Sequence, residues 1–314
     1  MHLDPDIEAA VIPDADAPIL RSLPLDEFRA EHDRQMAEGV GAPESIEVVS
    51  HISIPDHAVE LTRYQPADLR QPVPGLVFFH GGGWVIGNRG SHDPLARAIA
   101  NRARVVVISV EYRLAPEHPF PCSVEDATAA TRWILDHAIR LGVDPGHIGV
   151  GGDSAGGNLA AVVAWRMRDE GRPLACQLLL YPATSALQDT PSYREYASGF
   201  GLTAEDMAWF WSQYLASSGD PRDPNASPLL LGDATGLPPA IIVSAEADVL
   251  RDEAEAYADR LRAAGVPVIG IRALGMTHAF LNFVGTSSAA RSVLSMAAQE
   301  LGERLSIGVE RNSG

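Results

Sequence analysis

A serine stands at the centre of a glycine-rich turn, GDSAG, at residues 152–156. An apolar strand pattern at 147–151 precedes this G-x-S-x-G spacing, and a helical pattern follows from Ala155. Such a context permits a strained strand-to-helix turn that lifts the serine hydroxyl clear of the backbone. A similar turn can bind phosphate at a helix N-terminus, but the glycine spacing of a dinucleotide fingerprint is missing. We therefore predict that Ser154 is a nucleophile.

A serine hydroxyl needs a base that takes its proton, and the base needs an acid that orients it. Where this turn occurs, the acid and the histidine follow the serine in the chain. His278 is the one histidine of ten that lies after Ser154, and it follows the last predicted strand. Asp248 ends the preceding strand pattern, whereas its rivals Asp252 and Glu253 fall inside the next predicted helix. These positions predict a triad of serine, Asp248 and His278.

A run of glycines follows an earlier apolar strand pattern, in the sequence HGGGW at 80–84. Consecutive glycines let backbone N–H groups approach a substrate and stabilise the negative oxygen of a tetrahedral intermediate. We predict that Gly81, Gly82 and Ala155 supply these donors. His80 precedes the serine in the chain, so we interpret it as a structural hydrogen-bonding residue rather than a base.

The composition excludes several other chemistries. Cys122 and Cys176 have no partners at metal-binding spacing and H-E-x-x-H is absent, so we predict neither a metal nor a cofactor. All 24 basic residues are arginine. The absence of lysine excludes a Schiff base and a lysine-dependent phosphate loop. A formal net charge of −17 disfavours nucleic acid as a partner.

The sequence also bears on location. The first ten residues are acidic and lack the basic start and apolar stretch of a signal peptide. No apolar run approaches the ~20 residues that a membrane span requires. Two cysteines do not make a disulfide framework, which favours a reducing compartment. We expect a cytoplasmic protein.

Strand and helical patterns that alternate along the chain must position these residues. The alternation begins at about Ile46 and predicts an α/β fold, with a mostly parallel sheet flanked by helices. One stretch, 183–228, has no strand pattern and is rich in aromatic and turn residues. We predict that it forms a helical cap together with the N-terminal segment. The predicted divisions are a cap segment (1–45), the core (46–182), the cap insertion (183–228) and the rest of the core (229–314).

Aromatic residues in the cap insertion suggest how a substrate is bound. A helix predicted over 203–215 carries Trp209, Phe210 and Tyr214. With Trp84 of the glycine run, these side chains are predicted to line an apolar pocket. At helical spacing not all of them can face inward, so about half are expected to pack the cap onto the core.

Four segments taken together resemble the hormone-sensitive lipase family, the bacterial esterases also called family IV. They are HGGGW at 80–84, YRLAPE at 112–117, GDSAGG at 152–157 and DVLRDE at 248–253. The resemblance runs from about Ile46 to Phe283. It implies the α/β-hydrolase fold, the same triad and oxyanion hole, and a homodimer through the outermost strand. Val249 and Ala279 stand where the family usually has proline and glycine, and Ala279 is expected to narrow the space beside the histidine.

These observations predict a serine carboxylesterase that hydrolyses short- to medium-chain acyl esters, small molecules, through an acyl-enzyme. An amidase or peptidase with the same triad remains an alternative, and so does acyl transfer to an alcohol instead of water. A ligand-binding protein on this fold is a further alternative. It is disfavoured because receptors that resemble this family have lost triad members, typically the histidine, whereas Ser154, Asp248 and His278 are all present.

Overall fold

The computed structural model describes residues 2–11, 20–39, 42–55, 59–69 and 72–306. Within these ranges eight strands form one sheet, in the spatial order β1-β2-β4-β3-β5-β6-β7-β8. The pairs β1–β2 and β2–β4 are antiparallel and the other pairs are parallel. The strands are β1 (Val48–Ser53), β2 (Glu60–Gln65), β3 (Val73–Phe79), β4 (Val106–Glu111), β5 (Val143–Asp153), β6 (Gln177–Leu180), β7 (Ala240–Ala247) and β8 (Val268–Thr277).

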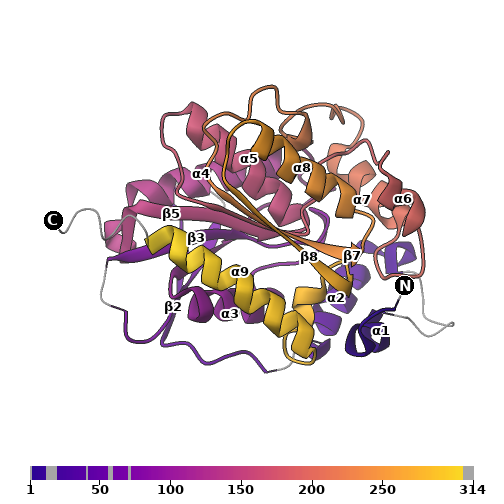
Figure 1. Cartoon of the computed structure of the whole chain (residues 1–314), viewed down its shortest axis with the longest axis horizontal. Helices are drawn as coiled ribbons and strands as arrows, with labels where there is room; N and C mark the ends of the chain where they lie inside the picture. Colours follow the sequence, from indigo (N-terminus) through magenta and orange to yellow (C-terminus); the bar gives the residue numbers. More distant parts are fainter. Residues whose placement is uncertain (1, 12–19, 40–41, 56–58, 70–71, 307–314) are drawn as a thin grey trace.

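Helices cover both faces of the sheet (Figure 1). The α-helices are α1 (Pro5–Val11), α2 (Leu25–Gly39), α3 (Asp93–Ala103), α4 (Cys122–Asp136), α5 (Ala155–Asp169), α6 (Pro191–Glu195), α7 (Ala204–Leu215), α8 (Arg251–Ala263) and α9 (Ser288–Ser306). Short 3₁₀ helices are η1 (Leu20–Ser22), η2 (Ile139–Leu141), η3 (Pro228–Leu230) and η4 (Phe280–Phe283). Helices α3 and α9 pack on one face, and α4, α5 and α8 pack on the other. This arrangement confirms the predicted α/β fold.

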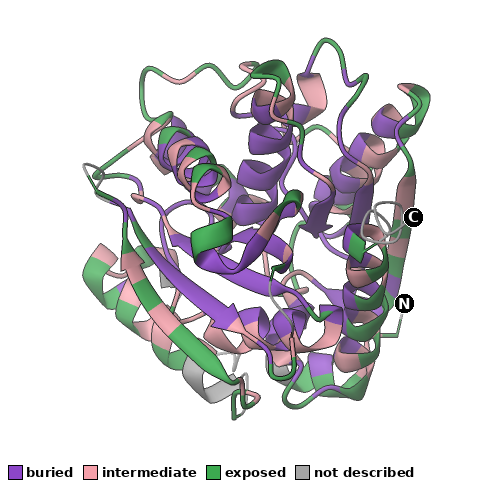
Figure 2. Ribbon diagram, turned by 90° about the vertical axis from the view of Figure 1, so that its left-hand side faces the viewer, coloured by how far each residue is buried: buried purple, intermediate pink, exposed green. Residues whose placement is uncertain are grey.

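Side chains of the central strands point alternately to the two faces of the sheet and form a hydrophobic core on each face. In β3, Leu76 and Phe78 join the cluster beneath α3 and α9, whereas Val77 and Phe79 join the cluster beneath α4 and α5. All four side chains are fully buried, and most residues of the central strands are buried (Figure 2). Burial on both faces explains why the sequence of β3 is a nearly unbroken apolar run.

Helix ends follow local signals that the sequence carries only in part. Helix α7 begins with a capping box: the Thr203 hydroxyl accepts the N–H of Asp206 at 3.0 Å, and the Asp206 carboxylate accepts the N–H of Thr203 at 3.1 Å. Helix α4 ends at Asp136, and the separate 3₁₀ turn η2 follows.

The N-terminal helices contact the segment that carries α6 and α7. Arg21 forms ion pairs with Glu205 (2.6 Å) and Asp206 (2.5 Å) at the start of α7. The ring of Phe28 in α2 lies 6.3 Å from that of Phe210 in α7. The Phe210 ring in turn covers the glycine run that follows the C-terminal end of β3. Two segments far apart in the sequence therefore meet over this end of the sheet.

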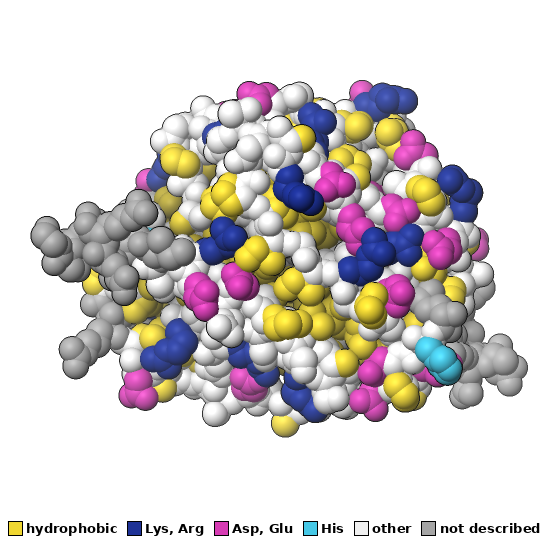
Figure 3. Space-filling model, in the orientation of Figure 1, with side chains coloured by type: hydrophobic (Ala, Val, Ile, Leu, Met, Phe, Trp, Pro, Cys, Tyr) yellow, Lys and Arg dark blue, Asp and Glu magenta, His cyan; other side chains and the backbone are white. Residues whose placement is uncertain are grey.

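The surface carries both signs of charge. On the face shown in Figure 3, arginine side chains lie among acidic side chains, and no large area of one sign is visible. Among the helices in the described ranges, none is both long and apolar enough to cross a membrane.

Candidate active site

Ser154 occupies the sharp turn between β5 and α5. Its φ of 54° and ψ of −119° lie in a region that residues other than glycine rarely adopt. Its N–H donates to the carbonyl of Leu180 at 2.9 Å, which ties the turn to β6. A Cβ atom on Gly152 would lie 2.4 Å from the backbone of Gly156, and one on Gly156 would lie 2.0 Å from the Phe79 oxygen. Only glycine fits at these two positions, which is why the turn has the G-x-S-x-G pattern.

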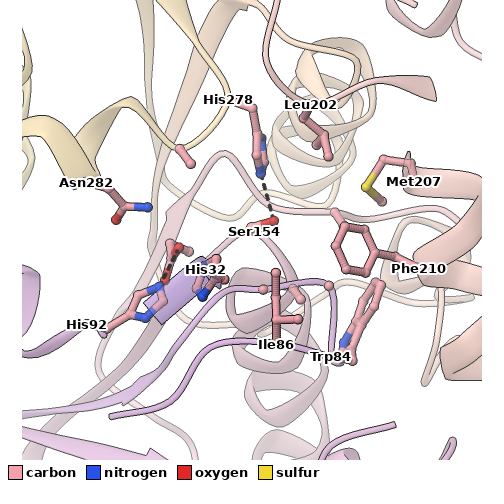
Figure 4. Close-up of a pocket in the computed structure, with 16 residues that line it drawn as sticks. His32, Trp84, Ile86, His92, Ser154, Leu202, Met207, Phe210, His278 and Asn282 are labelled. Carbon is pink, nitrogen blue, oxygen red and sulfur yellow. Dashed lines mark hydrogen bonds and ion pairs between the residues drawn. The ribbon is translucent and has the colours of Figure 1, made fainter. Parts of the chain in front are cut away.

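His278 contacts both Ser154 and Asp248. Its Nε2 lies 2.9 Å from Ser154 Oγ (Figure 4), and its Nδ1 lies 2.7 Å from Asp248 Oδ2. With the proton on Nδ1, the ring donates a hydrogen bond to the Asp248 carboxylate, and its Nε2 accepts a hydrogen bond from the Ser154 hydroxyl. Asp248 is 1% exposed and also accepts the N–H of Leu250 at 2.9 Å. The predicted residues, which follow β5, β7 and β8, thus meet at one end of the sheet.

The glycine run after β3 differs from the prediction. The N–H of Gly81 donates to Asp153 Oδ1 at 2.9 Å, so it points into a buried carboxylate and not toward a substrate. The prediction that Gly81 is an oxyanion donor is therefore wrong. Gly82 and Gly83 have φ values of 111° and 56° and line the cavity beside the serine, as Ala155 does. Within the described part of the chain, no acceptor is recorded for the N–H groups of Gly82, Gly83 and Ala155.

A second histidine–aspartate pair lies behind the glycine run. His92 Nε2 is 3.3 Å from Asp153 Oδ2, and both side chains are 2% exposed. Burial lowers the pKa of His92, but the adjacent carboxylate outweighs burial and raises this pKa above its ordinary value. Burial raises the pKa of Asp153, but His92 outweighs it and the pKa is lowered overall. Both shifts favour an ion pair, which anchors Gly81.

His80 packs against this pair without reaching the serine. Its Nδ1 lies 2.8 Å from the carbonyl oxygen of Gly81, and its ring stacks on Tyr112 at 4.3 Å. The Tyr112 hydroxyl donates to the His80 carbonyl at 2.7 Å. Burial lowers the pKa of His80 to about 4, so the ring is neutral. These contacts agree with the structural interpretation of His80.

A cavity of about 140 Å³ opens beside Ser154. Of the four aromatic residues predicted to bind substrate, Trp84 and Phe210 line this cavity, whereas Trp209 and Tyr214 do not. Tyr214 is fully buried and stacks on Trp84, with ring centroids 4.3 Å apart. Trp209 instead packs on Phe28 of α2, with ring centroids 5.8 Å apart, so two of the four side chains lie away from the cavity.

Comparisons to known proteins show the family of this chain. A family model described as the α/β-hydrolase fold matches residues 76–282, which is more than half of the 314 residues. The chain belongs to this family. The predicted resemblance to the hormone-sensitive lipase family is thereby confirmed.

Two curated relatives cover most of this α/β-hydrolase. It is 47% identical over 271 residues to the carboxylic ester hydrolase LipN of Mycobacterium tuberculosis, a match that covers 82% of the chain and 72% of the relative. It is 35% identical over 319 residues to an ethyl acetate hydrolase of Pseudomonas putida, covering 97% of the chain and 100% of the relative.

Two solved structures have the same fold. An ester hydrolase from the metagenome of Lake Arreo, complexed with a bipyridine phosphonate derivative, is 39% identical with a TM-score of 0.91 and coverage of 96% and 98% of the two chains. A thermostable esterase from Pseudomonas putida is 36% identical with a TM-score of 0.92 and coverage of 97% and 98%.

The acidic rivals of Asp248 have other partners in the α/β-hydrolase. Asp252 Oδ2 accepts the N–H of Ser192 at 2.8 Å. Glu253 is fully buried, and its Oε1 accepts the N–H of Thr184 at 2.6 Å. Burial raises the pKa of Glu253 to about 8, so this carboxyl is largely protonated at neutral pH. Neither rival contacts the histidine, and Asp248 alone of the three does.

Three further residues line the cavity of the α/β-hydrolase. Ala279 lines the cavity with a φ of 59°, so a methyl group occupies space beside His278 as expected. His32 from α2 and Asn282 from η4 also line the cavity, and the sequence analysis missed both. No local motif marks them, because they reach the cavity only through the tertiary fold.

Proposed function

We propose that this α/β-hydrolase is a serine carboxylesterase that forms an acyl-enzyme at Ser154. His278 takes the proton of the serine hydroxyl as the oxygen attacks the ester carbonyl, while Asp248 orients the ring and stabilises the imidazolium. His278 then protonates the leaving alcohol. Water attacks the acyl-enzyme with the help of the same base, and the carboxylic acid leaves. The main support is that one imidazole lies 2.9 Å from Ser154 Oγ and 2.7 Å from Asp248 Oδ2.

The relatives support an ester as the substrate. Proteins that match over most of the chain are named carboxylic ester hydrolase, ethyl acetate hydrolase and esterase. We assign the same reaction class to this chain, which is a carboxylic ester hydrolase.

Backbone donors supply the oxyanion hole in this proposal. Gly82, Gly83 and Ala155 line the cavity next to Ser154, and their N–H groups are available to the negative oxygen of the tetrahedral intermediate. Gly83 takes the place that the sequence analysis gave to Gly81. Such preorganised donors act in a site from which water is largely excluded, where each contributes roughly 10²–10³ in rate.

The cavity favours a short acyl chain. Its volume of about 140 Å³ is small, because pockets for drug-sized ligands usually measure about 300–1,000 Å³. Its apolar lining by Trp84, Leu202, Met207 and Phe210 suits a hydrocarbon group. We therefore propose that hydrolysis is fastest with acetyl to hexanoyl esters.

The test is the hydrolysis of p-nitrophenyl esters from C2 to C16, with Ser154→Ala as the control. The proposal predicts a maximum in kcat/KM at C2 to C6 and no activity above background in the variant. Equal activity of the variant, or no hydrolysis of any ester by the folded native protein, would contradict it.

The domain division and the assembly are further proposals. We propose that the 1–45 segment and the 183–228 insertion form a cap over a core of residues 46–182 and 229–314. Contacts of α2 and η1 with α7 support this division. Residues 1, 12–19 and 40–41 of the first segment lie outside the described residues. A homodimer through the edge strand β8 and a cytoplasmic location stay predictions.

A further inference from the structure

The cavity next to the serine has two unlike walls (Figure 4). Leu202, Met207 and Phe210 lie on one side of the serine, toward α7, and none of their side chains can form a strong hydrogen bond. His32 and Asn282 lie on the other side, where both bring polar groups to the cavity. A purely alkyl ester can pack against the apolar wall, but it offers no hydrogen-bonding group to the polar wall.

Asn282 is a buried polar residue of this wall whose side-chain hydrogen bonding is unmet. It is 8% exposed, and its Oδ1 has no hydrogen-bond partner among the described residues. The backbone N–H of Asn282 donates to the Ala279 carbonyl at 2.9 Å, which fixes the residue in η4, four positions after His278. In Figure 4 its amide points into the cavity. A buried amide is costly unless its hydrogen bonds are made, and a ligand can make them here.

His32 strengthens this polar wall from the cap side. Its Nδ1 lies 3.4 Å from Asp33 Oδ1, and Asn88 Nδ2 donates to Asp33 Oδ2 at 2.9 Å. Through Asp33, the imidazole is linked to the loop that precedes α3. The polar wall therefore combines a residue of the cap helix α2 with a residue that follows the catalytic histidine.

We propose that the enzyme prefers short esters with one apolar arm and one arm that carries a hydrogen-bonding group such as a hydroxyl, and that Asn282 recognises this group. This inference rests on the proposed function and deepens it by naming the substrate class. Asn282 acts as a specificity-determining residue, since its amide meets the substituent of the substrate and not the ester carbonyl. A site built to hydrogen-bond a hydroxyl discriminates against an analogue that lacks it more strongly than an apolar pocket can.

The experiment compares two pairs of esters that differ by one hydroxyl in place of one methyl group. 2-Hydroxyethyl acetate and propyl acetate test the alcohol arm, and methyl 3-hydroxypropanoate and methyl butanoate test the acyl arm. We would measure kcat/KM for the native enzyme, for Asn282→Leu, which keeps the size of the side chain, and for Met207→Leu on the apolar wall as the matched control. The ratio within each pair, variant against native, cancels the intrinsic reactivity of the esters and any uniform loss of active enzyme.

Asn282→Leu should lower the hydroxyl-to-methyl ratio about tenfold in one of the two pairs, the effect of one lost hydrogen bond. Met207→Leu should change neither ratio more than about twofold. Ratios that Asn282→Leu leaves unchanged in both pairs would overturn the inference, because the amide would then serve packing alone.

Two further outcomes keep the inference and the proposed function apart. If Asn282→Leu does not fold, as circular dichroism would show, the native enzyme decides. A preference for the hydroxyl member that exceeds the ratio of the two esters' rates of hydroxide-catalysed hydrolysis, in either pair, supports the inference, and no such excess in both pairs overturns it. Failure of the native enzyme to hydrolyse any of these esters in a Ser154-dependent way contradicts the proposed function itself.

Discussion

Two histidine–aspartate pairs lie near the same serine, and they make different contacts. His278 lies 2.7 Å from Asp248 and turns its other nitrogen toward Ser154 Oγ, 2.9 Å away. His92 lies 3.3 Å from Asp153, the residue directly before the serine. The residue types are identical and both aspartates are buried. The first pair is placed to move a proton, whereas the second is placed to hold a backbone.

The second pair shows what the environment adds to residue type. Asp153 has one oxygen near His92 and the other on the N–H of Gly81, and His92 Nδ1 lies 3.0 Å from Ser91 Oγ. The second nitrogen of His92 thus faces Ser91 and not Ser154, the nucleophile of the proposed reaction. We infer that Asp153 and His92 are positioning residues that keep the glycine run in place. Substitutions in the two pairs should therefore have effects on activity that differ in size and in kind.

The largest effect is expected from the histidine that contacts the serine. His278→Ala should lower kcat for p-nitrophenyl acetate by about 10⁶, because the base and the nucleophile work as a unit. Adding Ser154→Ala to this variant should cost almost nothing more. Steady-state kinetics on folded variants measure both. A loss of less than about 10², or full additivity of the two substitutions, would remove His278 from the proposed role.

A smaller loss of activity is expected when Asp248, the partner of His278, is substituted. Asp248→Asn should lower kcat by about 10⁴, because an amide favours the wrong imidazole tautomer and does not stabilise the imidazolium. The KM for a short ester should change little. If Asp252→Asn or Glu253→Gln lost as much activity as Asp248→Asn, the choice of acid would be wrong.

Catalytic activity should be much less sensitive to substitutions in the second pair. Asp153→Asn should lower kcat by roughly 10 to 100-fold with little change in KM, because the glycine run loses a charged anchor while the oxyanion donors themselves remain. The split between kcat and KM separates a positioning role from lost substrate binding. A loss near 10⁴ would mean that this pair takes part in proton transfer and that the comparison of the two pairs is mistaken.

A last effect of the second pair concerns stability and pH. The pKa of His92 is raised in the folded chain, so its contribution is present below the ordinary value of 6.5 and is lost as the pH rises through the raised pKa. The pKa of Asp153 is lowered, so its contribution is present above 3.8 and is lost as the pH falls. Asp153→Asn should thus cost roughly 3 kcal/mol of unfolding free energy near pH 5 to 6, and less at pH 9.

Urea unfolding of the native enzyme and of Asp153→Asn across this pH range checks the prediction. The difference in unfolding free energy should fall as the pH rises above neutrality. A difference that is constant from pH 5 to pH 9 would show that the two side chains do not form an ion pair.

The sequence predicted the contacts of the serine better than the lining of the cavity. Ser154, Asp248 and His278 each follow a strand, and the ends of parallel strands meet at one edge of a sheet whatever the details of packing. The glycine run is different. Three consecutive glycines look alike in the sequence, and only the contact between Gly81 and Asp153 shows which N–H is occupied.

The cavity depends on contacts between segments that no local pattern describes. Trp209 and Phe210 are neighbours in α7, yet only Phe210 lines the cavity, because adjacent residues on a helix face different directions. His32 comes from a helix more than one hundred residues before Ser154, and Asn282 stands among apolar residues of η4. Their place at the cavity follows from the way the cap packs on the core.

The most direct test of the central claim is the residue that an alkyl fluorophosphonate labels, because this reagent traps the activated nucleophile of a serine hydrolase. Trypsin cuts this chain only after arginine, and the peptide 141–166 contains Ser154 as its single serine. Mass spectrometry should find one phosphonyl group per chain, on Ser154, with activity lost in proportion and no labelling of Ser154→Ala. A label on another residue, or equal labelling of Ser154→Ala, would contradict the assignment of Ser154 as the nucleophile.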